Sequence, residues 1–230
     1  GSVWENTYRA DGKEFSLSQH GFARDMDFEL LSVTDTEVHY ALKDTPATRE
    51  KYPYGFRLEI GYRIEGRKVH VLWKVTNTDT REIHFQIGAH PAFYYPQYDE
   101  SPNRGYFAFG PTSKINYIGL QEKGCVNAQI HYDVPVDSDG LLPLNIHTFD
   151  IDTFIVEDSQ LTSVSILDMD KNPYLSVHFT APVVGLWSPP TKNAPFVCIE
   201  PWYGRCDRAQ YTGEYKDKDW TNHLGVGEVF

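Results

Sequence analysis

The fold is decided by residues 56–75, whose sequence is FRLEIGYRIEGRKVHVLWKV. Apolar side chains occupy every second position from Phe56 to Ile64, which is the period of a β-strand with one buried face. A short polar turn around Gly66 follows, and apolar residues resume at Val69. Two runs of this kind joined by a short turn predict a β-hairpin.

Strand-like runs separated by turns continue along the rest of the chain. We expect further strands at 37–42, 82–90, 163–168, 175–180, 183–187 and 196–200. No segment shows the apolar period of a long helix, and we expect long loops over 100–150, where Pro, Gly and Asn are frequent. This pattern indicates an all-β fold, a large antiparallel β-sandwich or barrel. We expect one domain over residues 1–230, because sandwiches of this length occur as single domains.

The charge balance limits the classes of partner. The chain carries 32 acidic and 21 basic residues, which gives a net charge of −11 and argues against a nucleic-acid surface. No apolar run approaches the roughly 20 residues that span a bilayer, and no signal peptide is visible. The three cysteines form no CxxC pair, which is typical of reduced thiols in a cytosolic protein. We therefore expect a cytoplasmic protein that binds a small neutral molecule and neither nucleic acid nor membrane.

Two ionisable residues each end an apolar run and precede a proline: His90 before Pro91, and Glu200 before Pro201. A residue before proline is held in extended geometry, so both side chains project from stiff backbone. A histidine and a carboxylate held in this way form a general acid–base pair if they face one another. The two motifs therefore predict a candidate catalytic pair.

Strand alternation indicates which neighbours share a face with these two residues. Gly88 lies on the same face as His90, and Cys198 on the same face as Glu200. A glycine beside His90 allows a ligand to approach the sheet closely. The sequence alone also permits a surface strand at His90.

The apolar run that leads to Glu200 predicts an unusual carboxyl group. Removal from water disfavours the charged form, so we expect the pKa of Glu200 to be raised and the carboxylate to be a better base near neutrality. The alternative is a structural role in a buried ion pair with Arg205 or Arg208, and spacing alone leaves both open.

A third polar stretch lies near the start of the chain. His20 precedes Gly21, and Arg24 precedes Asp25, with which it can form an ion pair. A lone histidine is more often a hydrogen-bonded structural residue than a catalyst. The sequence contains no HExxH, no CxxC and no set of two histidines and a carboxylate within one segment, so we expect no metal site. It also lacks a Gly-rich phosphate loop and a GxSxG nucleophile elbow.

Three of these stretches, taken in order, resemble the aldose 1-epimerase (galactose mutarotase) superfamily, and most of all its branch of LacX-like proteins. They are QHGFARD at 19–25, IGAHPAF at 87–93 and CIEPWYG at 198–204. The resemblance extends over nearly the whole chain. It implies a large antiparallel β-sandwich with an open sugar-binding cleft, and an enzyme that interconverts the α and β anomers of an aldose.

The resemblance also implies roles for single residues. Glu200 corresponds to the general base that takes the proton of the anomeric hydroxyl, and His90 to the general acid that protonates the ring oxygen. His20 corresponds to a histidine that positions the substrate. Asp152 corresponds to a carboxylate that binds sugar hydroxyls, although Asp150 competes for this role.

The reaction that the resemblance implies requires no metal and no organic cofactor. An aromatic residue near the site, such as Trp202, Tyr203 or Phe93, is expected to stack on the apolar face of the sugar ring. Members of the family usually carry several dozen residues before the first signature, so we expect that N-terminal strands of the sandwich are missing from this chain.

Two further functions remain open at this stage. A hexose-6-phosphate 1-epimerase would need a basic clamp, for which Arg24 with Arg205 or Arg208 are the candidates. A non-catalytic carbohydrate-binding module would use the same cleft without turnover. The sequence does not decide between a monomer and a homodimer.

Overall fold

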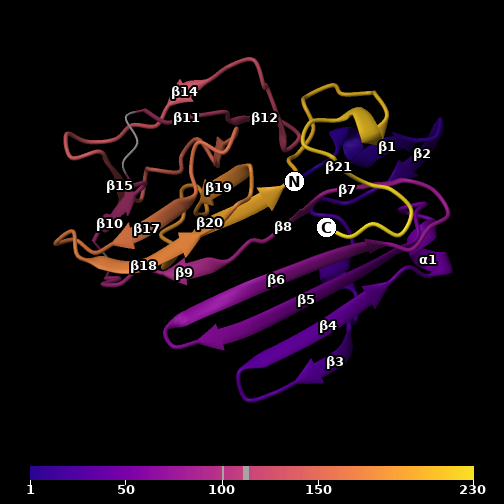
Figure 1. Cartoon of the computed structure of the whole chain (residues 1–230). Coiled ribbons are helices and arrows are strands. Elements are labelled where there is room, and N and C mark those ends of the chain that lie inside the picture. The colour runs from indigo at the N-terminus through magenta and orange to yellow at the C-terminus, as the bar shows by residue number, and fades with distance from the viewer. Residues whose placement is uncertain (100, 111–113) are drawn as a thin grey trace. The chain divides into compact units, whose positions relative to one another are not determined.

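The chain folds into two units of antiparallel strands. The computed structural model describes residues 1–99, 101–110 and 114–230. The first unit contains residues 1–85 and 210–230, and the second contains residues 86–209. Among the described residues every pairing between named strands is antiparallel (Figure 1), which confirms the prediction of an all-β fold.

The first unit is built around a four-stranded sheet in the order β3-β4-β5-β6. Its elements are η1 (Trp4–Asn6), β1 (Thr7–Ala10), β2 (Lys13–Ser16), η2 (Ala23–Asp25), β3 (Glu29–Val33), β4 (Glu37–Lys43), α1 (Pro46–Arg49), β5 (Phe56–Glu65), β6 (Lys68–Asn77), β7 (Ile83–Phe85), η3 (Tyr215–Asp217) and β21 (Asn222–Leu224). The predicted hairpin is confirmed as β5 and β6, which pair from Phe56 with Asn77 to Glu65 with Lys68. No helix in the described part of the chain is long and apolar enough to cross a bilayer.

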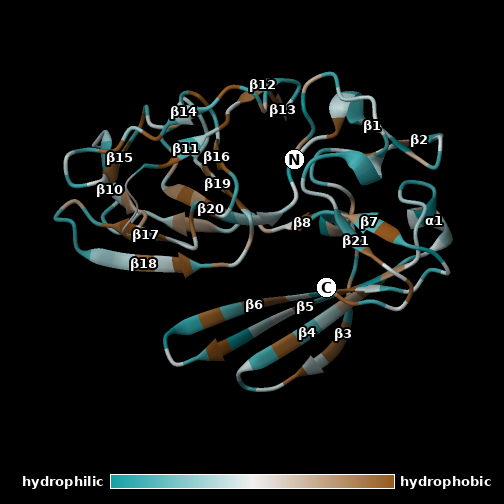
Figure 2. Cartoon of the chain, turned by 45° about the horizontal axis from the view of Figure 1, so that its top comes forward, coloured by the Kyte–Doolittle hydropathy of each residue, from teal (hydrophilic) through white to brown (hydrophobic). Residues whose placement is uncertain are grey.

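The apolar face of this sheet is covered at one end only. Phe56 and Leu58 are buried, and the ring of Phe22 lies 6.1 Å from that of Phe56. Further along β5, Tyr62 and Ile64 occupy the same face but are 45% and 54% exposed. Hydrophobic bands on β4, β5 and β6 are visible in Figure 2. The alternation predicted from the sequence is therefore present, but the end of the hairpin extends beyond the side chains that cover its base.

The second unit is a sandwich of two sheets. Its strands are β8 (Ile87–Gly88), β9 (Ala92–Tyr94), β10 (Asn103–Ala108), β11 (Asn116–Tyr117), β12 (Leu120–Glu122), β13 (Cys125–Val126), β14 (Tyr132–Asp133), β15 (Leu141–Asn145), β16 (Phe154–Val156), β17 (Ser163–Leu167), β18 (Pro173–His178), β19 (Val183–Trp187) and β20 (Phe196–Tyr203). One sheet has the order β15-β10-β17-β18, and the other has the order β16-β19-β20-β8, with β9 also paired to β20. Phe107 and Ile166 of the first sheet and Leu186 and Ile199 of the second meet in one core and are fully buried.

The strand predicted at 82–90 is wrong as a continuous element. It divides into β7 and β8, with Gln86 between them, because the two halves have different partners. β7 pairs with β21, whereas β8 pairs with β20. The chain passes from the first unit to the second at this point.

The prediction of long loops over 100–150 is also wrong in part. β10 to β15 all fall in this region. Three of them have only two residues, and β10 carries a bulge between Asn103 and Gly105, so no period of two is long enough to detect. Pro143 interrupts the pattern of β15, which tolerates a proline because it lies at the edge of its sheet.

Candidate active site

The second unit brings His90 and Glu200 together. Glu200 lies in β20, and two cross-strand pairs frame its position: Trp202 with Gly88 of β8, and Cys198 with Ala92 of β9. The same register, continued between these pairs, places His90 opposite Glu200. The His90 Nδ1 atom lies 3.3 Å from the Glu200 Oε1 atom. Pro91 has no N–H, so the ladder is interrupted at this point and the loop carries the imidazole over the carboxyl group.

The two partners differ strongly in their exposure to solvent. Val197 and Ile199 point into the sandwich core, so Glu200 projects from the opposite face of β20. Its side chain is nevertheless only 3% exposed, whereas that of His90 is 45% exposed. The carboxyl group is thus buried beneath the imidazole, which lies between it and solvent.

Burial changes the acidity of Glu200. Removal from water raises the pKa of the carboxyl group to about 8, and the negative charge of Asp152 contributes in the same direction. A hydrogen bond from the Trp202 side chain opposes the shift by stabilising the carboxylate. The resulting group titrates close to neutral pH, as an efficient general base does.

Trp202 lies flat on the sheet beside Glu200. A Cβ atom built on Gly88 would come within 2.7 Å of the Trp202 Cδ1 atom, and one built on Gly185 within 2.5 Å of the Cζ2 atom. These glycines belong to β8 and β19, the strands on either side of β20. The indole therefore spans all three strands, and the absence of side chains at the two glycines makes room for it.

Trp187 is a neighbour of the pair that the sequence did not single out as a site residue. Its ring meets the imidazole of His90 edge to face, with centroids 5.3 Å apart and an interplanar angle of 87°. Trp187 pairs with Cys198 across β19 and β20, so it shares the face of Glu200. The alternation of β19 shows which residues share a face with Trp187. That this face is also the face of Glu200 follows only from the register of β19 with β20, which the sequence does not reveal.

The structure separates the two aspartates that compete for one role. Asp152 lies near enough to Glu200 for its charge to raise the pKa of that carboxyl group. It has a left-handed φ of 72°, and the Thr153 hydroxyl donates a hydrogen bond of 2.8 Å to it. Asp150 instead forms a 2.9 Å contact with the exposed His147. Of the two, Asp152 is the one whose charge acts on Glu200.

His20 and Arg24 belong to the first unit, so their roles at the site stay predictions. His20 has a left-handed φ of 67°, and Gly21 follows it with 72°. The Nε atom of Arg24 lies 3.6 Å from Asp25, and both side chains are exposed.

The buried ion pair that was an alternative for Glu200 forms at another carboxylate. The Nε atom of Arg205 lies 2.5 Å from Glu157 Oε1, and both side chains are buried. Arg205 also donates a hydrogen bond to the backbone carbonyl of Cys206. Glu200 has His90 as its ion-pairing partner instead.

One set of atoms at this site has the spacing of metal ligands. His90, Cys198 and Glu200 each offer one ligand atom, all within 4.8 Å of one another. Burial, reinforced by the charge of Glu200, raises the pKa of the Cys198 thiol to about 12. Without a metal ion, Cys198 is therefore a protonated, buried thiol at neutral pH.

Comparison with known proteins connects this site to a family. The family model described as aldose 1-epimerase matches residues 4–109. The plasmid-encoded Protein LacX of Lactococcus lactis is 27% identical over 192 residues, which are 82% of this chain and 64% of LacX. The chain thus spans somewhat less than two thirds of that relative.

Solved structures give closer matches. A galactose mutarotase related enzyme from Lactobacillus acidophilus superposes with a TM-score of 0.90 at 31% identity, covering 100% of this chain and 77% of that one. A galactose mutarotase-like protein from Lactobacillus casei superposes with a TM-score of 0.91 at 26% identity, covering 100% and 79%. The fold, the sequence matches and the ordered motifs agree. The chain therefore belongs to the aldose 1-epimerase (galactose mutarotase) superfamily, in its LacX-like branch.

Proposed function

We propose that the protein is an aldose 1-epimerase that interconverts the α and β anomers of a hexose. Glu200 acts as general base and His90 as general acid. The observation that carries the proposal is the 3.3 Å contact between a buried carboxyl group and a half-exposed imidazole on one face of the sheet. Membership in the aldose 1-epimerase superfamily supports it.

The proton transfers balance within this pair. The Glu200 carboxylate takes the proton of the hydroxyl on C1, and a protonated His90 gives a proton to the ring oxygen. The bond between C1 and the ring oxygen breaks with its electrons on that oxygen, and the aldehyde forms. After rotation about the C1–C2 bond, the ring closes on the other face of the aldehyde. His90 then takes back its proton, and Glu200 returns one to the oxygen on C1.

The short contact fits this chemistry because both reacting oxygens are bonded to the same carbon. The 3.3 Å separation leaves no room for a sugar ring between His90 and Glu200. The sugar must instead lie over the pair with its C1 edge toward both groups. The Trp202 indole, flat on the neighbouring sheet surface, supplies a platform for the ring.

The raised pKa of Glu200 favours the ring-opened stage. Ring opening converts a protonated His90 and an ionised Glu200 into a neutral His90 and a neutral Glu200. Burial raises the pKa of Glu200 to about 8, and so stabilises the neutral carboxyl group present after proton abstraction. The same site can then run the transfer in both directions near neutral pH, as an anomer exchange requires.

The remaining site residues are proposed to bind the substrate. Asp152, through its link to Glu200, is placed to accept hydrogen bonds from sugar hydroxyls. His20 is assigned to substrate positioning by the family motif at 19–25, and Arg24, in the same stretch, is proposed to bind the substrate.

The structure removes Arg205 as a candidate for the basic clamp of a hexose-6-phosphate enzyme and leaves Arg208, which is exposed. The phosphate alternative needed a basic clamp that included Arg205 or Arg208. Arg205 is buried, and its guanidinium pairs with Glu157 at 2.5 Å. An arginine committed to a buried carboxylate does not provide a free cation for phosphate.

The proposal is tested by the rate at which anomers of glucose and galactose equilibrate, followed by polarimetry and by saturation-transfer NMR. We expect Glu200→Gln and His90→Asn each to lower the catalysed rate by at least about 100-fold, because a positioned acid or base contributes on the order of 10²–10⁴-fold. Glu122→Gln and His178→Asn are the matched controls, since both residues are exposed on other strands.

Four outcomes separate the hypotheses. Loss of activity in both site variants but neither control supports the proposed pair. Full activity in both site variants would refute it. Sugar-dependent thermal stabilisation of the wild type with no rate enhancement on any sugar would indicate a carbohydrate-binding module, and faster turnover of glucose 6-phosphate than of glucose would indicate the phosphate-specific enzyme.

A further inference from the structure

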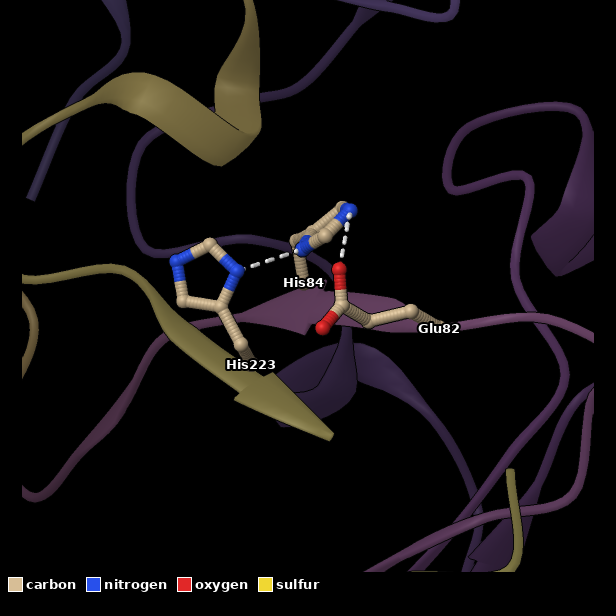
Figure 3. A group of neighbouring side chains, drawn as sticks. All are labelled: Glu82, His84 and His223. Atoms are coloured by element: carbon tan, nitrogen blue, oxygen red, sulfur yellow. Dashed lines mark hydrogen bonds and ion pairs between the residues drawn. The ribbon is translucent and has the colours of Figure 1, made fainter. Parts of the chain in front are cut away.

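The first unit contains a cluster of two histidines and a carboxylate that the proposed reaction does not use. His84 lies in β7 and His223 in β21, and the two residues are cross-strand partners in the antiparallel ladder. Glu82 precedes His84 by two residues and therefore projects to the same side. Figure 3 shows the imidazole of His84 between His223 and Glu82.

The two imidazoles contact one another through their Nδ1 atoms, and a ring nitrogen is the atom by which histidine binds a metal. The Nδ1 atoms of His84 and His223 are 3.0 Å apart. At most one of two facing nitrogens can donate a proton to the other, so at least one carries a lone pair directed into the gap. Two nitrogens bound to one tetrahedral Zn²⁺ at about 2.0–2.1 Å lie about 3.3 Å from each other. A small rotation of the exposed His223 ring reaches this spacing.

The surroundings hold the His84 ring in a fixed orientation. Its side chain is buried. The Tyr54 ring packs edge to face against it at 5.6 Å, and the Tyr52 hydroxyl donates a hydrogen bond to its backbone carbonyl at 2.8 Å. An imidazole whose ring is fixed by its neighbours is already oriented for a metal ion.

Glu82 lies beside the other ring nitrogen of His84. One of its oxygens is 3.8 Å from the His84 Nε2 atom, on the side of the ring away from His223, which is an ion-pair distance and longer than a hydrogen bond. A supporting hydrogen bond would therefore have to form as the metal binds. In many metal sites the ligating histidine donates its other N–H to such a carboxylate, which fixes the tautomer and raises the basicity of the ligand. All three residues offer atoms within 4.8 Å of one another.

We propose that His84 and His223 bind a divalent transition-metal ion between their Nδ1 atoms, with Glu82 orienting His84, and that the ion ties β21 to β7. Imidazole nitrogen suits Zn²⁺, Ni²⁺ and Cu²⁺, whereas Mg²⁺ and Ca²⁺ prefer oxygen ligands. Waters complete the coordination, because His223 and Glu82 face solvent. The site is independent of the proposed sugar chemistry.

Zinc chloride titrated into the full chain by calorimetry, in a buffer that does not chelate metals, is the first test. We expect one zinc equivalent that excess Mg²⁺ does not displace and that His223→Ala abolishes. Glu82→Gln should weaken binding by about 10–100-fold, the usual effect of losing a supporting carboxylate. His178→Ala is the matched control, because it removes an exposed histidine from another strand.

The imidazole resonances of the ¹⁵N-labelled wild type give a second readout that needs no variant. Zinc should shift the ring nitrogens of His84 and His223 before those of other histidines. Wild-type zinc affinity in His223→Ala, or unshifted resonances of both rings, would overturn the proposal and leave a hydrogen-bonded histidine pair. Loss of the zinc equivalent in His90→Asn but not in His223→Ala would also overturn it, because the ion would then belong to the other histidine–cysteine–glutamate group.

Discussion

Replacing Glu200 by glutamine should make the fold less sensitive to pH. The folded-state pKa of Glu200 is raised to about 8 from an ordinary value of 4.5, mainly because the carboxyl group is buried. Below pH 4.5 the group is neutral in both the folded and the unfolded chain. As the pH rises, the unfolded chain loses this proton first, so the free energy of unfolding falls until the folded group also ionises near pH 8.

The size of the effect follows from the shift. A difference of about 3.5 pKa units at about 1.36 kcal/mol per unit corresponds to ~5 kcal/mol of stability that is present below pH 4.5 and lost above pH 8. A protonated His90 at 3.3 Å favours the carboxylate and offsets part of this loss. We therefore expect the wild type to lose roughly 2–5 kcal/mol more than Glu200→Gln between pH 5 and pH 9.

Urea unfolding followed by far-ultraviolet circular dichroism, at unit steps from pH 5 to pH 9, measures this difference. Glu122→Gln removes the same charge from an exposed position on β12 and should follow the wild type. The curve of Glu200→Gln should instead cross that of the wild type and lie above it at alkaline pH. Parallel curves for the wild type and Glu200→Gln would show that the carboxyl group ionises as easily in the folded as in the unfolded chain, and the account of the buried base would be wrong.

Three further predictions concern the surroundings of the site. Gly185→Ala places a methyl group 2.5 Å from the Trp202 ring, so the indole must tilt. Because a stacking contact is lost, we expect KM for the sugar to rise by up to about tenfold while the circular dichroism stays unchanged. An unchanged KM would contradict the role of Trp202 as a platform for the sugar ring. Arg205→Met leaves Glu157 buried without its cation and should lower the urea-derived stability by about 3–5 kcal/mol, whereas a loss below about 1 kcal/mol would argue that the pair contributes little. Burial raises the pKa of the Cys198 thiol to about 12, so the thiol should resist iodoacetamide at pH 8 until urea unfolds the chain. Peptide mass spectrometry locates the label, and rapid labelling of Cys198 in the native protein would count against its burial.

The sequence predicted the parts of the fold that have long, regular alternation. The hairpin of β5 and β6 followed from ten-residue strands with an unbroken period of two. The strands of two or three residues between 100 and 150 escaped notice because so short a run has no measurable period. The break after β7 was missed for another reason. A change of partner strand at Gln86 leaves no mark in the local pattern.

The candidate site was predictable as residue types but not as a geometry. The prolines after His90 and Glu200 marked both residues, yet their contact depends on the register of β20 with β8 and β9, which forms over long sequence separations. The partner of Arg205 was missed because Glu157 is 48 residues away. A search for metal ligands within one segment could not find a histidine pair separated by 139 residues.

The indole that lies across three strands also constrains how this family can diverge. Gly88 and Gly185 stay free of side chains so that Trp202 can lie flat between them. A larger residue at either glycine requires the indole to tilt or a smaller side chain at 202, and a smaller side chain there leaves a gap that the glycines cannot fill. The three positions should therefore change together among relatives, as one inherited unit spread over β8, β19 and β20. Lineages that lose the tryptophan are where a new side chain on β8 or β19 would first become accessible.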